Sequence, residues 1–390
     1  MMNTKCTCVV VSAAALVIVL AFSAGAKACS IGCADGTVTQ DGRPILWKVR
    51  QLGLSEPNNY LRYFTHYEID GVEHPAVYPY IGIASLLSDS STERKTLPMM
   101  SLNTQGLCTG DASGGRRDST STNGSEFMCY MIANFANVAE VRTEIQWRHD
   151  NIGSANRHEG SFPFMDAQGN ATMFEYDREV FFEYQTSNAN RSGNMLPAPS
   201  CFSYTVPAIT RNQQGWVVRS NKFHENADGA DDLCGGYGCD NYYYSAAYNV
   251  CGLINEGVLS AKTLMNGYDG SLYRYELPRY GPGRDMKLLA DPGTVSTAVF
   301  QGVAPGEDPA LTTMWAAMGR ADYSITVPAW VAVTDIPQVL RDGHMAERAH
   351  SLHSKNWRGY SYEGAEAVTQ GCTLPCEARI FDEVNSLLEH

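Results

Sequence analysis

The sequence has no basic run and no excess of positive charge. Its 390 residues include 42 Asp and Glu against 29 Lys and Arg, a formal net charge of −13 at pH 7, and the acidic residues are scattered. Nucleic acids and anionic membrane surfaces attract basic patches. We therefore predict no nucleic-acid partner and no docking on anionic membranes, although the charge says nothing about a substrate.

Long apolar runs are also missing, except at the beginning of the chain. Residues 1–28 contain an apolar core over Val9–Ala24, followed by small residues at Ala26 and Ala28. This core is short and close to the end of the chain, which favours a secretion signal over a membrane span. We expect cleavage before Cys29, a secreted or periplasmic protein, and no membrane span after signal removal.

A lipoprotein signal is the alternative, because a cysteine follows the cut directly. Such signals usually carry a large aliphatic residue three positions before the cysteine. Ala26 occupies that position, followed by Lys27, so this interpretation is disfavoured.

The chain shows no internal repeat, interdomain linker or low-complexity tail. The residues after the signal suffice for one large domain or two ordinary ones. Strand patterns occur in both halves of the chain, with a long helical pattern between them. This arrangement favours a single α+β domain over residues 29–390.

Hydrophobic periodicity and turn residues predict the main elements. The clearest helix is Glu126–Gln146, and a hairpin turn is expected at Asp166–Gly169. The Gly- and Tyr-rich segment Asn226–Asn249 is interpreted as an excursion from the core. Helical pieces are expected at 253–266 and 286–289, and strands at 30–33, 45–49, 60–68, 216–220, 295–300 and 324–333.

The chain has twelve cysteines, and ten remain once the two in the signal are removed. Disulfides are plausible in an exported protein. Two pairs are close in sequence, Cys234 with Cys239 and Cys372 with Cys376. Zinc binding is the alternative for these pairs, but no histidine stands beside either at ligand spacing, so disulfides or unpaired thiols are favoured.

Cys29 would become the first residue after signal cleavage. An N-terminal cysteine carries a thiol nucleophile and a free α-amine, which can act as its base, on the same residue. The competing interpretation is a cysteine that merely follows the signal cut, perhaps bonded to Cys33 or another partner.

Several motifs follow Cys29-Ser30-Ile31 in a fixed order. The first begins twelve residues later with Asp41-Gly42 and leads to Trp47-Lys48. The others are Leu102–Leu107, Asp166–Gly169 with Glu175, Val218–Phe223, Ser271–Tyr275, Thr312–Trp315 and Val327–Trp330. Together they resemble the N-terminal-nucleophile amidohydrolases that use cysteine, such as bile-salt and penicillin V hydrolases and the isopenicillin-N acyltransferase group. The acyltransferase-like branch is the more similar.

The resemblance implies an α+β fold, a four-layer αββα sandwich of two antiparallel sheets with helices outside. It implies cleavage of linear amide C–N bonds in a small-molecule N-acyl amide, by hydrolysis or acyl transfer, without a metal or organic cofactor. Penicillins, bile-salt conjugates, N-acyl amino acids and acyl-homoserine lactones all suit this scaffold. The oligomeric state is left open.

The resemblance also implies roles for four residues. Cys29 would attack the carbonyl carbon and form a thioester, with its own α-amine moving the proton. Lys48 would place a cation close to the sulfur, which favours the thiolate. Asn221 would stabilise the oxyanion, and Arg274 would organise the nucleophile and its network.

The chain departs from the family pattern at several positions. Gln51 stands where relatives carry the carboxylate that binds the nucleophile's amine, and glutamine can accept a hydrogen bond but cannot balance a positive charge. Val49 and Asp111 stand where relatives often have asparagine, and Lys222 where they have histidine.

Two other functions remain open at this point. These departures would suit a catalytically degenerate binding protein on the same fold. An unrelated secreted protein stapled by disulfides, with all ten cysteines paired, is the second.

Overall fold

The computed structural model describes residues 29–51, 58–86, 97–112, 124–152, 159–177, 180–187, 215–220, 241–266, 294–319, 323–356, 379–384 and 386. The expected signal, the helical piece at 286–289 and the two close cysteine pairs lie outside these residues. So do the expected site residues Asn221 and Arg274.

The described strands form two antiparallel sheets. The six-stranded sheet has the order β10 (Trp216–Ser220), β1 (Ser30–Ala34), β2 (Ile45–Gln51), β11 (Thr294–Gln301), β12 (Thr313–Met318) and β13 (Val327–Ala329). The seven-stranded sheet follows chain order: β3 (Asn58–Ile69), β4 (Val72–Leu86), β5 (Met100–Asn103), β6 (Cys108–Gly110), β7 (Glu159–Met165), β8 (Ala171–Asp177) and β9 (Val180–Gln185).

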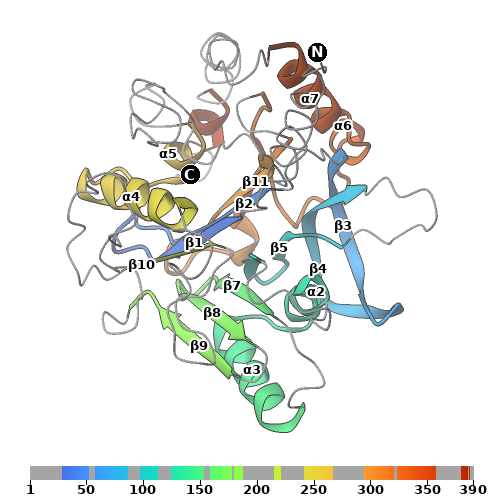
Figure 1. The fold of residues 1–390 in the computed structure, drawn as a ribbon, viewed down its shortest axis with the longest axis vertical. Helices are drawn as coiled ribbons and strands as arrows, with labels where there is room; N and C mark the ends of the chain where they lie inside the picture. The colour runs from blue at the N-terminus through green and yellow to red at the C-terminus, as the bar shows by residue number, and fades with distance from the viewer. Residues whose placement is uncertain are drawn as a thin grey trace, which may run out of the picture.

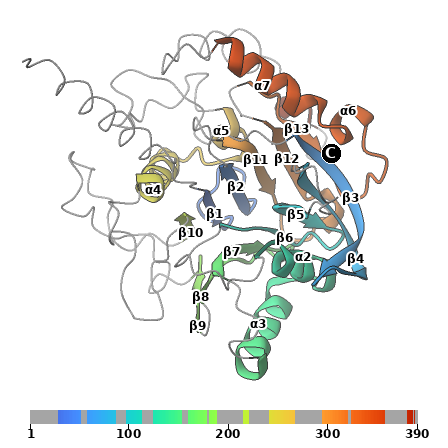
Figure 2. The same cartoon turned by 45° about the vertical axis from the view of Figure 1, so that its right-hand side comes forward.

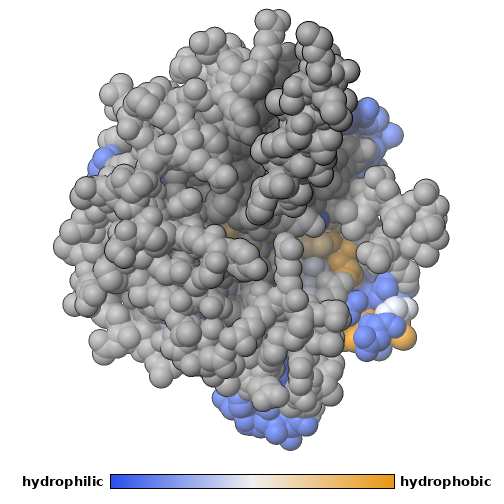
Figure 3. Space-filling view, in the orientation of Figure 1, coloured by the Kyte–Doolittle hydropathy of each residue, from blue (hydrophilic) through white to orange (hydrophobic). Residues whose placement is uncertain are grey.

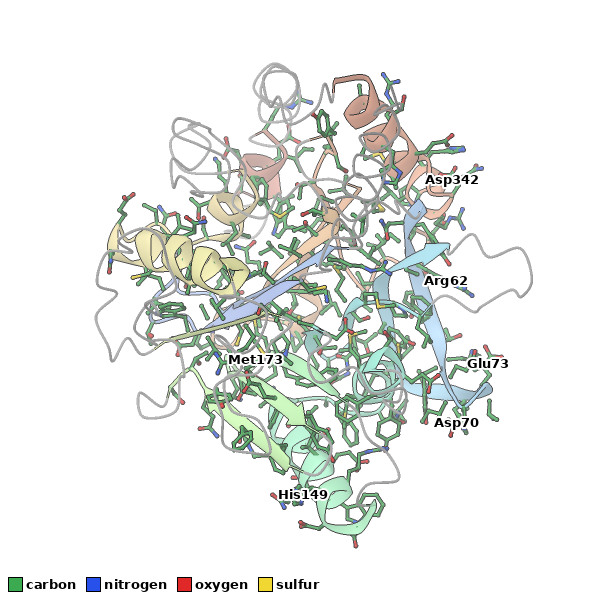
Figure 4. All side chains as sticks on the ribbon, in the orientation of Figure 1. Arg62, Asp70, Glu73, His149, Met173 and Asp342 are labelled. Atoms are coloured by element: carbon green, nitrogen blue, oxygen red, sulfur yellow. The ribbon has the colours of Figure 1, made fainter. Side chains whose placement is uncertain are left out.

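The two sheets pack face to face, as strand alternation requires. One side of each strand contributes to a shared apolar core between the sheets, for example Ile31 and Leu46 from the first sheet and Leu102 and Met173 from the second. Figure 4 shows Met173 near the centre of the molecule, where side chains from both sheets meet.

Helices cover both outer faces. Helices α4 (Asn241–Asn255) and α5 (Ala261–Asn266) pack on the outward side of the six-stranded sheet. Helices α2 (Gly124–Asn134) and α3 (Val138–Ile152) cover the other sheet, as Figures 1 and 2 show. The expected four-layer αββα sandwich is therefore confirmed.

Two helices follow these layers near one end of the sandwich, beyond the last predicted strand. Helices α6 (Gln338–Arg341) and α7 (His344–Asn356) contact β3, and α7 also contacts β12. These helices close one end of the inter-sheet core, because Ala346 of α7 belongs to that core.

The single helix expected over 126–146 is wrong, because α2 and α3 are separate. Asn137 is the reason for the break: its Oδ1 accepts from the backbone N–H of Glu140 at 3.0 Å. Glu140 in turn accepts from the backbone N–H of Ala136 at 2.7 Å. Asn137 is thus the N-cap of α3, and the Glu140 carboxylate binds the backbone of the residue before it, so a new helix starts where the apolar periodicity continues.

Three other expectations need correction. The strand expected at 324–333 is limited to β13. The helix expected at 253–266 is two helices, divided by a turn in which Gly257 has a φ of 70°. Residues 241–249, expected in an excursion, belong to α4. The remaining predicted strands and the hairpin turn at Asp166–Gly169 are confirmed, with β2 and β3 longer than expected.

The described surface includes both hydrophilic and apolar areas. Figure 3 shows a hydrophilic region where α3 ends and small apolar spots near the β3–β4 hairpin, where Val72 and Val77 are exposed. No helix in the described part of the chain is long and apolar enough to cross a membrane.

Gly32 gives a test of how closely β1 and β2 pack. Its Cβ, if present, would lie 2.2 Å from Cζ2 of the buried Trp47, its partner across the strands. We expect Gly32→Ala to lower the free energy of unfolding by about 1–3 kcal/mol, measured by urea denaturation. Val77→Ala, on the exposed hairpin, is the control and should change it by no more than about 0.5 kcal/mol. Equal stability of both variants would contradict this packing.

Candidate active site

Cys29 directly precedes β1, the strand that lies between β2 and β10. Its side chain belongs to the inter-sheet core together with Ile31 and Cys33, and the residue is 8% exposed. Cys29 carries a thiol. The sequence thus places a nucleophilic atom at the end of a buried strand, between the two sheets.

Two buried cations flank β1 at the same level. Ile31 is paired with Lys48 on β2 and with Arg219 on β10. Each cation reaches across to a carboxylate of the other sheet. The Lys48 Nζ lies 3.1 Å from Oδ1 of Asp111, which follows β6, and the Arg219 guanidinium binds Glu175 on β8.

Because both ion pairs are buried, each charged side chain in them needs its partner. The Lys48 side chain is 2% exposed, and those of Arg219 and Glu175 are 0% exposed. A buried charge without a partner is costly, so each pair must stay together. Arg219 is further held by Tyr184, whose ring centroid lies 4.2 Å from the guanidinium carbon, and by the Val218 carbonyl oxygen, which accepts at 2.7 Å.

Arg50, which lies on β2 like Lys48, is the third of these buried cations. It lies two residues beyond Lys48, and β2 residues alternate between faces, so the two share the inter-sheet side. Arg50 donates to Oδ1 of Asn59 at 3.2 Å, and Nδ2 of Asn59 donates to the Val295 carbonyl at 2.6 Å. Ser30 on β1 pairs with Val49 on β2. Cys29 precedes Ser30 and Arg50 follows Val49, so the two are the next residues opposite each other.

Electrostatics connects Arg50 to Cys29. Burial lowers the pKa of the Arg50 guanidinium, while the charges of Asp111 and Cys29 act to raise it. Both groups therefore lie within electrostatic reach of Arg50.

Other buried thiols have a different environment. Cys33, Cys108 and Cys129 are free thiols, and burial raises the pKa of each well above its usual range. They remain protonated and act as small apolar residues. Because these three are unbonded, the alternative of a protein with all ten cysteines in disulfides is wrong.

The structure brings together two of the four residues named from sequence. Cys29 and Lys48 share the inter-sheet side of neighbouring strands. Asn221 and Arg274 lie outside the described residues. Asn221 is the next residue in the chain after Ser220, which pairs with Ser30, the residue after Cys29.

The departures from the family pattern fall in different places. Val49 is buried on the outward face, among residues of α4, so it does not line the site. Asp111 belongs to the site, as the partner of Lys48. Gln51 ends β2, and its side chain lies outside the described residues.

Arg50 is the residue that sequence reasoning missed. The strand predicted over 45–49 ends two residues before β2 does. A strand extended to residue 51 would have placed Lys48 and Arg50 on one face. Glu175 and Arg219 stand within the quoted motifs, but no role was given to either.

Metal ligands do not gather at this site. Within the described ranges, no group of three or more His, Cys, Asp or Glu side chains is arranged to hold a metal ion.

Comparisons with known proteins gave matches only among solved structures. No family model and no curated protein sequence matches the chain. The conjugated bile acid hydrolase from Clostridium perfringens has a TM-score of 0.42 at 12% identity, covering 77% of this chain and 92% of its own. Penicillin V acylase from Agrobacterium tumefaciens has a TM-score of 0.38 at 10% identity, covering 77% and 85%.

A third match is the Caenorhabditis elegans ortholog of N-acylethanolamine-hydrolyzing acid amidase. Its TM-score is 0.32 at 9% identity, covering 71% of this chain and 94% of its own. The first two matches are the kinds of enzyme that the sequence resembles. All three likenesses are too distant to assign an activity, so function has to be argued from the site itself.

The Arg219–Glu175 pair gives a test of the flanking charges. Arg219→Met leaves Glu175 buried without its cation, so we expect a loss of about 3–5 kcal/mol in the free energy of unfolding, measured by chemical denaturation. Arg219→Met with Glu175→Leu should recover much of this loss, because no charge is then left unpaired.

Lys262 offers the matched control, since its pair with Asp382 is exposed. Lys262→Met should cost no more than about 1 kcal/mol. Similar losses for the exposed and the buried pair would show that the buried pair does not tie the sheets together.

Proposed function

We propose that this protein is an exported enzyme that cleaves linear amide C–N bonds with the thiol of Cys29 as nucleophile. The observation that supports it is the position of Cys29 at the end of a buried strand, beside Arg50 and between two strands that carry buried cations. A thiol in a positively charged, partly accessible site is the arrangement expected of a reactive cysteine.

The reaction would proceed in two stages. The Cys29 sulfur attacks the carbonyl carbon, and the α-amine, freed by removal of residues 1–28, takes the thiol proton. The C–N bond then breaks, the amine group returns the proton to the leaving nitrogen, and the acyl group stays on sulfur as a thioester. Water, or an amine acceptor, attacks the thioester and restores the thiol.

Buried cations would support the first stage. Lys48 and Arg50 favour the thiolate through their charge, without contributing a proton. Asn221 is proposed as an oxyanion donor, a role in which loss of one hydrogen bond costs about 2.7–4 kcal/mol in other amide-cleaving enzymes. Arg274 is proposed to organise the network around the nucleophile. Both roles rest on the sequence motifs.

The remaining parts of the proposal follow from the sequence. Residues 1–28 act as the signal whose removal activates the enzyme, and residues 29–390 form a single domain. The protein acts in a secreted or periplasmic location on a small-molecule N-acyl amide. Neither a metal nor an organic cofactor takes part in these steps.

The first experiment is to determine the N-terminus of the exported protein by mass spectrometry, and the expected start is Cys29. The protein is then incubated with a panel of N-acyl amides, including conjugated bile acids, penicillin V and N-acylethanolamines, and released amine is measured. We expect release with at least one member of the panel.

Two variants make this experiment decisive. Cys29→Ala should abolish release, since no nucleophile remains, and Cys33→Ala should retain it, because Cys33 is a protonated core thiol. An acyl adduct on the Cys29 peptide, seen by mass spectrometry after rapid quenching, would support the thioester. A mature start elsewhere, or equal release by Cys29→Ala, would refute the mechanism. A correctly processed protein that binds acyl amides without forming an adduct would be the degenerate binding protein.

A further inference from the structure

Asp111 is held on both sides by the backbone around it. The preceding Gly110 lies against β1 and β2, since a Cβ at Gly110 would be 3.3 Å from Cδ1 of Ile31 and 3.3 Å from Cβ of Lys48. The following Ala112 exchanges two backbone hydrogen bonds of 2.9 Å with Ser161 on β7. The position of the Asp111 carboxylate is therefore set by the place where the two sheets approach each other.

Charged side chains around β1 come from both sheets, in addition to the α-amine that signal removal would free on Cys29. From β2 there are Lys48 and Arg50, and from β10 there is Arg219. The other sheet contributes Asp111 and, from β8, Glu175. Among these five described side chains the cations outnumber the carboxylates by one, three against two. Glu175 is paired with Arg219. Asp111 is therefore the carboxylate beside the two cations of β2.

We propose that Asp111 is a positioning residue that holds the Lys48 ammonium in place and cancels one of the two β2 charges, and that it thereby sets the pH range in which Cys29 reacts. This inference rests on the proposed function for its catalytic meaning, but its electrostatic part concerns the thiol alone.

Removing the Asp111 charge should make the thiolate easier to form. Asp111→Asn keeps the shape and a hydrogen-bond acceptor for Lys48, but leaves two uncompensated cations on β2. A charge within about 4–6 Å of a titratable group shifts the protonation of that group by about one pH unit or more. The midpoint of Cys29 reactivity should therefore move about one unit toward lower pH.

The measurement is alkylation by iodoacetamide as a function of pH. It uses the protein whose start at Cys29 has been established, and it quantifies the Cys29 peptide by mass spectrometry, so that the other cysteines do not contribute. The acidic limb of the pH–rate profile for amide release should shift in the same direction. Alkylation tests the electrostatic inference even when no amide is cleaved, so failure of the proposed function and failure of this inference can be told apart.

Two further variants separate charge from structure. Asp111→Glu keeps the charge and should keep the wild-type midpoint. Lys48→Met with Asp111→Asn removes one charge of each sign, so the midpoint should return close to the wild-type value, although the rate is expected to fall. The double variant also leaves no unpaired charge and serves if Asp111→Asn does not fold. An unchanged midpoint in folded Asp111→Asn, or an equal shift in the double variant, would overturn the proposal.

Discussion

Two ion pairs that cross between the sheets determine how β1, the strand that follows Cys29, is held. Lys48–Asp111 and Arg219–Glu175 flank β1 at the level of Ile31, one on either side. Apolar packing alone is non-directional and would allow the sheets to slide past each other by small amounts. A buried cation must remain opposite its carboxylate, so the pairs fix the relative position of β1, β6 and β8. The Cys29 thiol, which directly precedes β1, is held in place as a result.

The same burial gives the site its chemical character. The interior of the sandwich is apolar around Cys33 and Cys108, and those thiols stay protonated because a charge there would be desolvated. Cys29 lies in the same layer but beside Arg50, whose guanidinium is coupled to it electrostatically. Cys29 and Cys33, only four residues apart, thus differ in their charged neighbours. The difference arises from the cations of β2, and not from the strand itself.

Local patterns predicted most of the sandwich, whereas its long-range contacts could not be predicted. Alternation identified β1, β10 and β11, and the Asp166–Gly169 turn identified the β7–β8 hairpin. A lysine on a strand is usually solvated, and only its tertiary partner, 63 residues away, makes Lys48 a buried charge. Glu175 and Arg219 are 44 residues apart. The capping residues Asn137 and Glu140 were visible in the sequence, but the continuing periodicity concealed the break between α2 and α3.

A bulge in β11 constrains how this chain could change in length. Thr294 and Ser296 pair with adjacent residues of β2, Gln51 and Arg50, so Val295 is an extra residue in the ladder. Its carbonyl accepts from the backbone N–H of Gly319 and from Asn59 of the opposite sheet. Deleting Val295 would regularise the ladder and leave the other pairs unchanged, but it would remove the carbonyl to which both Gly319 and Asn59 donate. Homologous chains that keep Asn59 as the acceptor for Arg50 should therefore keep the extra residue at this point of β11.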